Sequence, residues 1–457
     1  MRLFVAVMRR FGELQQQLEL LASLSREDLL QRAVTLERRN FELENIVKKL
    51  TNETECVECN KRPFDFNKYK KRHIALQFAY LGWEYSGLAM QKDYPSTVMQ
   101  KIMESLAKCR LIEETDTQQF VVCGRTDKGV SAMGQVVSMT VRSAVLSGLG
   151  ILEESGPSSS TVNDAQKQEI DYVFLLNRVL PRDIRVIAWS PVDLDFNARF
   201  SCLQRTYSYF LPLSGLNVED AAFRLVGTHD FRNFCSSPVD ERLGTFVRRI
   251  DHCDVSFSNS QCETFSNPHS MIEISISASG FLYHQIRCIV SIMVMVGRGF
   301  ESPQIVDELL DLTKTPAKPQ YQMADDLPLM FVNATYPDNA VNWETSTAAQ
   351  SDLVRHFQRL STEHTIRAVT VKKILDHIEN RFSSDKKVYH HLDRIVPECR
   401  WREDGDGKRA HKPIVKRQLE PTIEEKRDRA KRKKSSFVRD DDSCEIVQNI
   451  SENINND

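Results

Sequence analysis

The chain has 457 residues, enough for two or three domains or for one large domain with extensions. Hydrophobic residues make up 41% of it, so a sizeable core can form, and the formal net charge of −2 excludes binding to nucleic acid through a uniform positive field. The best apolar run, over 288–296, is far shorter than the ~20 residues of a membrane-spanning helix, so we expect no membrane partner.

The N-terminal segment has a heptad pattern typical of a helix. Leucines recur every seven residues at Leu29, Leu36, Leu43 and Leu50, and the polar Asn40 falls at one of the interleaved positions. A leucine seam with one asparagine favours a two-stranded coiled coil in fixed register, and it predicts a homodimer formed through this helix. Because only about three heptads are present, a single helix packed on its own domain is the alternative.

The cysteines and the first residues bear on the cellular compartment. Most of the 11 cysteines lie in apolar stretches, which predicts free buried thiols in a reducing compartment. Cys56 and Cys59 form a Cys-x-x-Cys pair without a second pair, so a linker with two thiols is favoured over zinc. Residues 1–11 lack the long hydrophobic core of a secretory signal, and we expect a nuclear and cytoplasmic protein, with a mitochondrial fraction as the alternative.

From about residue 73 the sequence alternates between strand and helix patterns. Strands are expected over 74–78, 120–123, 136–141, 184–189, 205–210, 246–251 and 271–276. Helices are expected over 98–109, 285–296 and 303–312. The two kinds of element intermix without a regular βα alternation, which predicts an α+β fold rather than a doubly wound sheet.

Composition predicts how the chain is subdivided. Glycines and serines over 146–168 indicate a flexible insertion, and the basic cluster over 426–434 fits a nuclear-import signal or an RNA contact. The expected parts are a helical coiled-coil segment (1–50), a basic linker (51–72), a main domain (73–335) with halves of about 73–200 and 201–335, a C-terminal extension (336–425), and the basic cluster with a disordered acidic tail (426–457).

A glycine-flanked turn follows one of the expected strands. Residues 124–129, Gly-Arg-Thr-Asp-Lys-Gly, place Asp127 between Arg125 and Lys128. Glycines permit close approach of a ligand, and the flanking cations favour an ionised carboxylate. Such a carboxylate can act as a nucleophile or base towards a bound polyanion. Taken alone, the six residues favour a solvated surface turn, since such turns are common.

Two further segments contain candidate site residues. Arg205, Tyr207 and Tyr209 alternate along one expected strand, which suits a stacking surface for a base and equally a core strand. Arg287 lies among apolar neighbours at the start of an expected helix, which predicts a buried acidic partner. His284 fits a general base or, as is more common, a structural histidine at a helix start.

Five sequence blocks, taken in order, resemble the TruA family of tRNA pseudouridine synthases. They lie at 124–137, 176–186, 198–209, 227–231 and 280–287, within a region of about 73–335. The segments at 62–66, 199–203 and 318–321 and the leucine-rich N-terminal helix are similar to the eukaryotic branch that modifies positions 38 and 39 of the tRNA anticodon arm. The segment Gly-Leu-Ala-Met-Gln at 87–91 departs from the Gly-Trp-Gln of bacterial members.

The resemblance implies isomerisation of uridine to pseudouridine in tRNA, without a metal or an organic cofactor. It implies a pseudouridine synthase fold, with a mostly antiparallel central sheet, flanking helices and an RNA cleft across the sheet. Asp127 would be the catalytic residue, Arg125 would assist flipping of the target nucleotide, Tyr207 would stack on the uracil, and Arg287 would pair with Asp127. A tRNA pseudouridine synthase of broader specificity in the same family and an inactive tRNA-binding or chaperone protein are the alternatives.

Overall fold

The computed structural model describes residues 39, 64–91, 96–113, 120–153, 168–212, 218–236, 245–257, 271–382, 411–422, 424–426 and 428–429. The chain divides into two compact units, over 1–65 and 66–457, and nearly all described residues belong to the second. The expected coiled coil, apart from Arg39, and the Cys56–Cys59 pair lie outside the described residues. So do residues 154–167 of the expected insertion and most of the basic cluster and tail.

One nine-stranded sheet forms the centre of the second unit, in the order β4-β1-β3-β9-β5-β8-β7-β6, with β2 paired to β3. The strands are β1 (Lys70–Tyr80), β2 (Val121–Val122), β3 (Ser131–Ser143), β4 (Ile184–Pro191), β5 (Gln204–Pro212), β6 (Gly227–Asp230), β7 (Val247–Phe257), β8 (Met271–Ala278) and β9 (Leu329–Thr335). Every pair is antiparallel except β3 with β9, which run parallel with Ser131 opposite Met330. The expected α+β fold with a mostly antiparallel sheet is confirmed.

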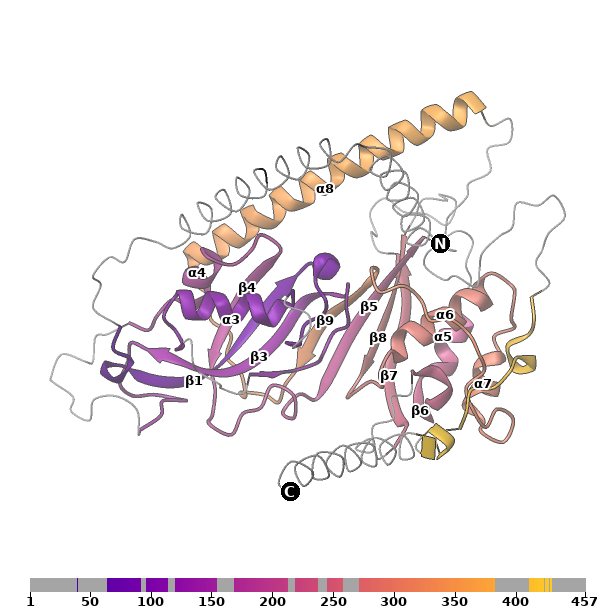
Figure 1. The fold of residues 1–457 in the computed structure, drawn as a ribbon, viewed down its shortest axis with the longest axis horizontal. Helices are drawn as coiled ribbons and strands as arrows, with labels where there is room; N and C mark the ends of the chain where they lie inside the picture. The colour runs from indigo at the N-terminus through magenta and orange to yellow at the C-terminus, as the bar shows by residue number, and fades with distance from the viewer. Residues whose placement is uncertain are drawn as a thin grey trace, which may run out of the picture. The chain divides into compact units, whose positions relative to one another are not determined.

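Helices pack against the sheet in two groups. They are α3 (Val98–Lys108), α4 (Tyr172–Asn177), α5 (Glu219–Leu225), α6 (Gln285–Gly297), α7 (Ile305–Leu310) and α8 (Thr347–Phe382). Figure 1 shows α3 and α4 beside β1, β3 and β4, and α5, α6 and α7 gathered near β6, β7 and β8. Short 3-10 helices lie at Phe66–Lys68 (η1), Gly82–Glu84 (η2), Arg232–Phe234 (η4) and Ile414–Lys416 (η6).

Local sequence explains the two longest helices that the pattern predicts. The side chain of Thr97 caps α3 by accepting from the backbone N–H of Gln100 at 3.4 Å. The apolar residues of α3 recur at helical spacing and bury one face of the helix. Helix α6 is apolar on all sides, and all of its residues from Gln285 to Val296 are buried, as expected for a helix in the middle of a core.

The structure also contains elements that the sequence pattern did not predict. The strands β6 and β9 and the helices α4, α5 and α8 are additions to the expected set. The 36-residue α8 lies in the expected C-terminal extension, and only Ala349 and Leu353 among its residues are buried. Because so short a stretch of α8 meets the core, its sequence has only a weak apolar stripe. Among the described residues, no helix is long and apolar enough to cross a bilayer.

Gly82 provides a test of how the turn over 124–129 is supported. A Cβ at Gly82 would lie 1.9 Å from the backbone oxygen of Val130, directly after that turn. We expect Gly82→Ala to lower the free energy of unfolding by roughly 1–3 kcal/mol, because neither backbone can yield without moving a strand. Denaturant titration measures the change. Gly280→Ala is the control, since a Cβ there meets nothing within 4 Å, and equal stability of both variants would contradict this packing.

Candidate active site

The turn over 124–129 joins β2 to β3 and is held from two sides. The wholly buried side chain of Gln135 donates a hydrogen bond to the carbonyl of Gly124 at 2.9 Å and accepts one from its N–H at 3.4 Å. The hydroxyl of Tyr80 lies 2.6 Å from the hydroxyl of Thr126. Buried hydrogen bonds of this kind fix the backbone that leads into the carboxylate of the turn.

Gly129 closes the turn in a conformation that needs glycine. Its φ is +80°, and its N–H donates to the carbonyl of Tyr85 at 3.2 Å. A Cβ there would lie 2.7 Å from a carboxylate oxygen of Asp326. The loop that leads into β9 therefore lies directly against the turn, so residues from both ends of the main domain form this site.

An open cleft of about 870 Å³ lies beside the turn, and all four residues that the sequence singled out line it. These are Arg125, Asp127, Tyr207 and Arg287. Three more arginines complete a cationic lining: Arg199, Arg205 and Arg248. Among the described residues that line the cleft, Asp127 is the one carboxylate. A cleft with this charge pattern suits a polyanion such as RNA, with a single acidic group available for chemistry.

The arginines of the cleft differ in what holds them. The guanidinium of Arg205 donates to the carbonyl of Cys123 at 3.0 Å and to that of Arg199 at 2.6 Å, so it links two walls of the cleft. Arg125 is exposed and makes no side-chain hydrogen bond or ion pair with any described residue. Its guanidinium is therefore available to a ligand.

Tyr207 lies on β5 as part of an aromatic wall. Its ring meets Phe281 and Phe331 edge-to-face, with centroids 5.3 and 5.0 Å away. Burial raises the pKa of its hydroxyl, so the hydroxyl keeps its proton at neutral pH. Tyr207 can thus offer an aromatic surface and an O–H group, but not a phenolate base.

The expected direct pair between Arg287 and Asp127 is wrong. Within 4 Å the carboxylate partner of Arg287 is Asp326, with Nη2 3.9 Å from Oδ2. Its Nε donates to the carbonyl of Ala324 at 2.7 Å, which fixes the guanidinium beside that segment. Two contacts with the loop before β9 thus hold Arg287, although its charge still reaches Asp127 through the electrostatic field.

His284 is the basic side chain that touches Asp127, with Nε2 3.4 Å from Oδ2. It precedes α6 in the left-handed conformation, at φ 59°, a backbone state that non-glycine residues rarely adopt. Burial, Arg287 and Lys318 lower its pKa to about 4, so the imidazole is neutral at pH 7. The tautomer with a proton on Nε2 lets Ser236 donate to Nδ1 at 3.0 Å and leaves Nε2 as the ring nitrogen beside Asp127.

Asp127 itself has a raised pKa, contrary to the expectation that its cationic neighbours dominate. Burial is the largest cause, and the carboxylate of Asp326 adds to it, while Arg287 opposes both. The positive charges of Arg125 and Lys128 in the turn do not outweigh the effect of burial on the pKa of Asp127. A carboxylate with a raised pKa is a stronger base and nucleophile than an exposed aspartate.

Sequence reasoning found some parts of this site and missed others. Asp326 gave no local signal, since it follows an acidic neighbour in a loop and meets the turn only in the folded chain. Arg199 lies inside the sequence block at 198–209, where it could have been noticed as a second arginine. Among the described residues, no cluster of three or more metal-binding side chains occurs.

Comparisons with known proteins identify a family and several relatives. A sequence model of the family described as tRNA pseudouridine synthase matches residues 221–337. The Bos taurus protein named tRNA pseudouridine(38/39) synthase is 40% identical over 325 residues, 70% of this chain. That match spans 66% of the bovine protein, just under two thirds of its length.

Two more distant eukaryotic relatives are matched over more of their length. The Saccharomyces cerevisiae tRNA pseudouridine(38/39) synthase is 39% identical over 71% of this chain and 73% of its own. The Caenorhabditis elegans protein named probable tRNA pseudouridine synthase tag-124 is 38% identical over 74% of this chain and 86% of its own.

The raised pKa of Asp127 predicts a cost in stability. Because its folded-state pKa lies above its unfolded one, ionisation of Asp127 destabilises the fold at neutral pH, and protonation removes that cost as the pH falls. We expect Asp127→Asn to raise Tm at pH 7.5 by about 1–2 °C, with the difference narrowing towards acid pH. Calorimetry over a pH series measures this. The exposed Asp338→Asn serves as control, and an unchanged or lower Tm for Asp127→Asn at pH 7.5 would refute the electrostatic account.

Proposed function

The chain belongs to the tRNA pseudouridine synthase family, and on that premise we propose that it isomerises uridine to pseudouridine at positions 38 and 39 of tRNA through Asp127. The observation that carries the proposal is a single carboxylate in a cleft lined by arginines. The names of the bovine and yeast relatives support the two positions.

The reaction needs a positioned carboxylate more than it needs a cofactor. Pseudouridine formation breaks the bond between the sugar and a ring nitrogen, turns the uracil and rejoins it to the sugar through carbon, so no electrons are gained or lost overall. Asp127 is the group in the cleft that can attack the nucleotide or take a proton from it. The neutral imidazole of His284, 3.4 Å away, holds the carboxylate without neutralising it.

The target base must leave the stacked anticodon arm to reach Asp127. Unstacking costs a few kcal/mol, and contacts between arginines and RNA phosphates offset that cost. We propose that Arg125, which is exposed at the turn and lines the cleft, occupies the space that the base leaves. The aromatic wall of Tyr207, Phe281 and Phe331 suits stacking on the flipped uracil, and Arg287 supplies positive charge beside the carboxylate.

Removal of the carboxylate tests the catalytic assignment. We expect Asp127→Asn to lower the rate of pseudouridine formation in uridine-containing tRNA transcripts by at least ~10³-fold, because the amide is neither nucleophile nor base. Chemical mapping of pseudouridine measures the product, and Asp338→Asn is expected to retain the wild-type rate. Full activity of Asp127→Asn would remove Asp127 from the mechanism.

The same assay separates the alternatives. Product that vanishes when uridines 38 and 39 are both replaced by cytidine supports the proposed positions, whereas product elsewhere on the tRNA indicates a broader-specificity enzyme. If the wild-type protein binds tRNA but makes no pseudouridine, the inactive tRNA-binding or chaperone protein is the correct interpretation.

We also propose that the N-terminal helix forms a coiled coil that joins two copies of the chain. The leucine seam supports this, with Leu36 and Leu43 in its middle. We expect Leu36→Asp/Leu43→Asp to halve the mass in solution, measured by light scattering. A carboxylate buried in the seam would lose its hydration without gaining a paired partner. Arg38→Asp/Asn45→Asp, on the opposite side of the same heptads, is the control. A dimer that survives the leucine variant must be formed by another surface.

A further inference from the structure

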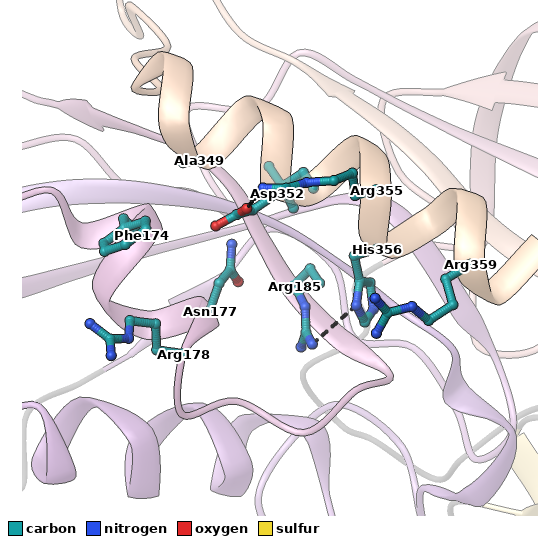
Figure 2. A pocket seen from close by; sticks show the side chains of 10 residues that line it. Phe174, Asn177, Arg178, Arg185, Ala349, Asp352, Arg355, His356 and Arg359 are labelled. Carbon is teal, nitrogen blue, oxygen red and sulfur yellow. Dashed lines mark hydrogen bonds and ion pairs between the residues drawn. The ribbon is translucent and has the colours of Figure 1, made fainter.

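A second hollow lies away from the cleft, between α4, β4 and the first turns of α8. It has a volume of about 320 Å³, and none of its lining residues lines the cleft around Asp127. Figure 2 shows the guanidinium groups of Arg178, Arg185, Arg355 and Arg359 arranged around it, with Asp352 above. We call this hollow the arginine pocket.

The charges of the arginine pocket do not balance. Asp352 forms an ion pair with Arg355, three residues along α8. Among the described residues, Arg178, Arg185 and Arg359 have no carboxylate within 4 Å. Three guanidinium groups that no described carboxylate pairs with therefore line one small hollow, where their positive fields add.

Arg185 is held as a fixed part of the pocket wall. Its guanidinium donates to the carbonyl of Ile184 at 2.6 Å and to that of Pro181, and Nη2 lies 3.3 Å from Nδ1 of His356. Burial lowers the pKa of Arg185, while the carboxylate of Asp183 opposes that shift, so the guanidinium is poorly solvated. A preorganised guanidinium loses little entropy when it binds an anion.

His356 adds no charge to the arginine pocket but keeps Arg185 in place. Its Nε2 lies 2.7 Å from the carbonyl of Arg182, which can only accept, so Nε2 carries the proton. Its Nδ1 then accepts from Arg185, and the ring is neutral. Burial and the neighbouring arginines lower the pKa of His356 and reinforce that state.

The remaining lining gives the pocket a partly apolar floor. Phe174 lies under the guanidinium of Arg178, 5.7 Å from its ring centroid, and Leu353 and Ala349 of α8 are buried beside it. The side-chain amide of Asn177 is occupied, because it bonds both backbone groups of Val186 at 2.8 and 2.9 Å. The groups that can meet a ligand are therefore the exposed guanidiniums of Arg178 and Arg359, with the fixed guanidinium of Arg185 beside them.

The arginine pocket and the cleft are associated with different strands of the sheet. Strand β4 is at the edge of the sheet, and β5, which carries Tyr207, is four strands further along. At a strand spacing of about 4.8 Å, β4 and β5 are roughly 20 Å apart across the sheet. A ligand that reaches both sites must be a long polyanion.

We propose that the arginine pocket is a second tRNA-binding site, which takes a backbone phosphate of the tRNA outside the target nucleotide. The proposal rests on the proposed function, since it assumes tRNA as the substrate. A guanidinium group can bind two phosphate oxygens at once, and three guanidinium groups with no described carboxylate within 4 Å line this pocket. The pocket contributes to affinity for the whole tRNA and not to the chemical step.

Charge removal at two exposed arginines tests the proposal. In full-length protein carrying Asp127→Asn to prevent turnover, Arg178→Gln/Arg359→Gln is expected to weaken binding of full-length tRNA roughly tenfold. The slope of log Kd against log salt concentration is expected to fall by about 1–2, because fewer counterions are released. The control Lys314→Gln/Lys416→Gln removes two positive charges from exposed lysines elsewhere and is expected to leave both quantities unchanged.

A conservative variant and a comparison of KM with kcat separate a loss of tRNA binding from a loss of folding. Arg178→Lys/Arg359→Lys keeps the charges and is expected to restore the salt slope while recovering only part of the affinity, since lysine cannot bind a phosphate in paired fashion. With otherwise wild-type protein, the glutamine variant is expected to raise KM for tRNA and leave kcat unchanged. A fall in kcat with KM unchanged would overturn the proposal.

The remaining outcomes distinguish a failure of the arginine-pocket proposal from a failure of the proposed function. If the glutamine variant binds tRNA as tightly as the lysine control, with the same salt slope, the proposal fails even though the wild type makes pseudouridine. If an Asp/Glu-rich peptide, and not tRNA, binds in a way that depends on Arg178 and Arg359, the pocket serves an acidic protein segment and the proposal is overturned. If tRNA binding depends on the pocket but no pseudouridine forms, only the proposed function fails.

Discussion

The hydrogen bonds that fix the turn over 124–129 are the constraint on which the site depends. Gln135 holds one end of the turn, Tyr80 holds its middle through Thr126, and the positive φ of Gly129 lets its other end pass under Asp326. These partners come from β3, β1 and the loop before β9, which lie together in the sheet. The sheet thus converts three distant stretches of sequence into one rigid support for a carboxylate.

The electrostatics around Asp127 are a compromise between binding and reactivity. A ring of arginines favours a polyanion, yet burial and Asp326 keep the pKa of Asp127 above its ordinary value. The neutral His284 contacts the carboxylate without forming an ion pair. A fully paired carboxylate would be stable but weakly basic, whereas this arrangement keeps its basicity at some expense of folding stability.

Sequence patterns predicted what depends on neighbours along the chain. The apolar spacing of α3 and the continuous apolar run of α6 were sufficient to predict these two helices. The ordered sequence blocks identified Asp127, Tyr207 and Arg287, which line the cleft. Two features depend on folding instead. The partner of Arg287 is Asp326, 39 positions away in a loop, and α8 meets the core only near its start, so neither leaves a periodic signal.

The parallel pairing of β3 with β9 has a consequence for how the protein acquires its site during synthesis. Ser131 and Ala132 follow the turn directly and pair with Met330 and Phe331, which emerge from the ribosome about 200 residues later. Until then the turn lacks Asp326, the segment that anchors Arg287, and part of the aromatic wall. The motif is thus translated early, but the surface around it is assembled late.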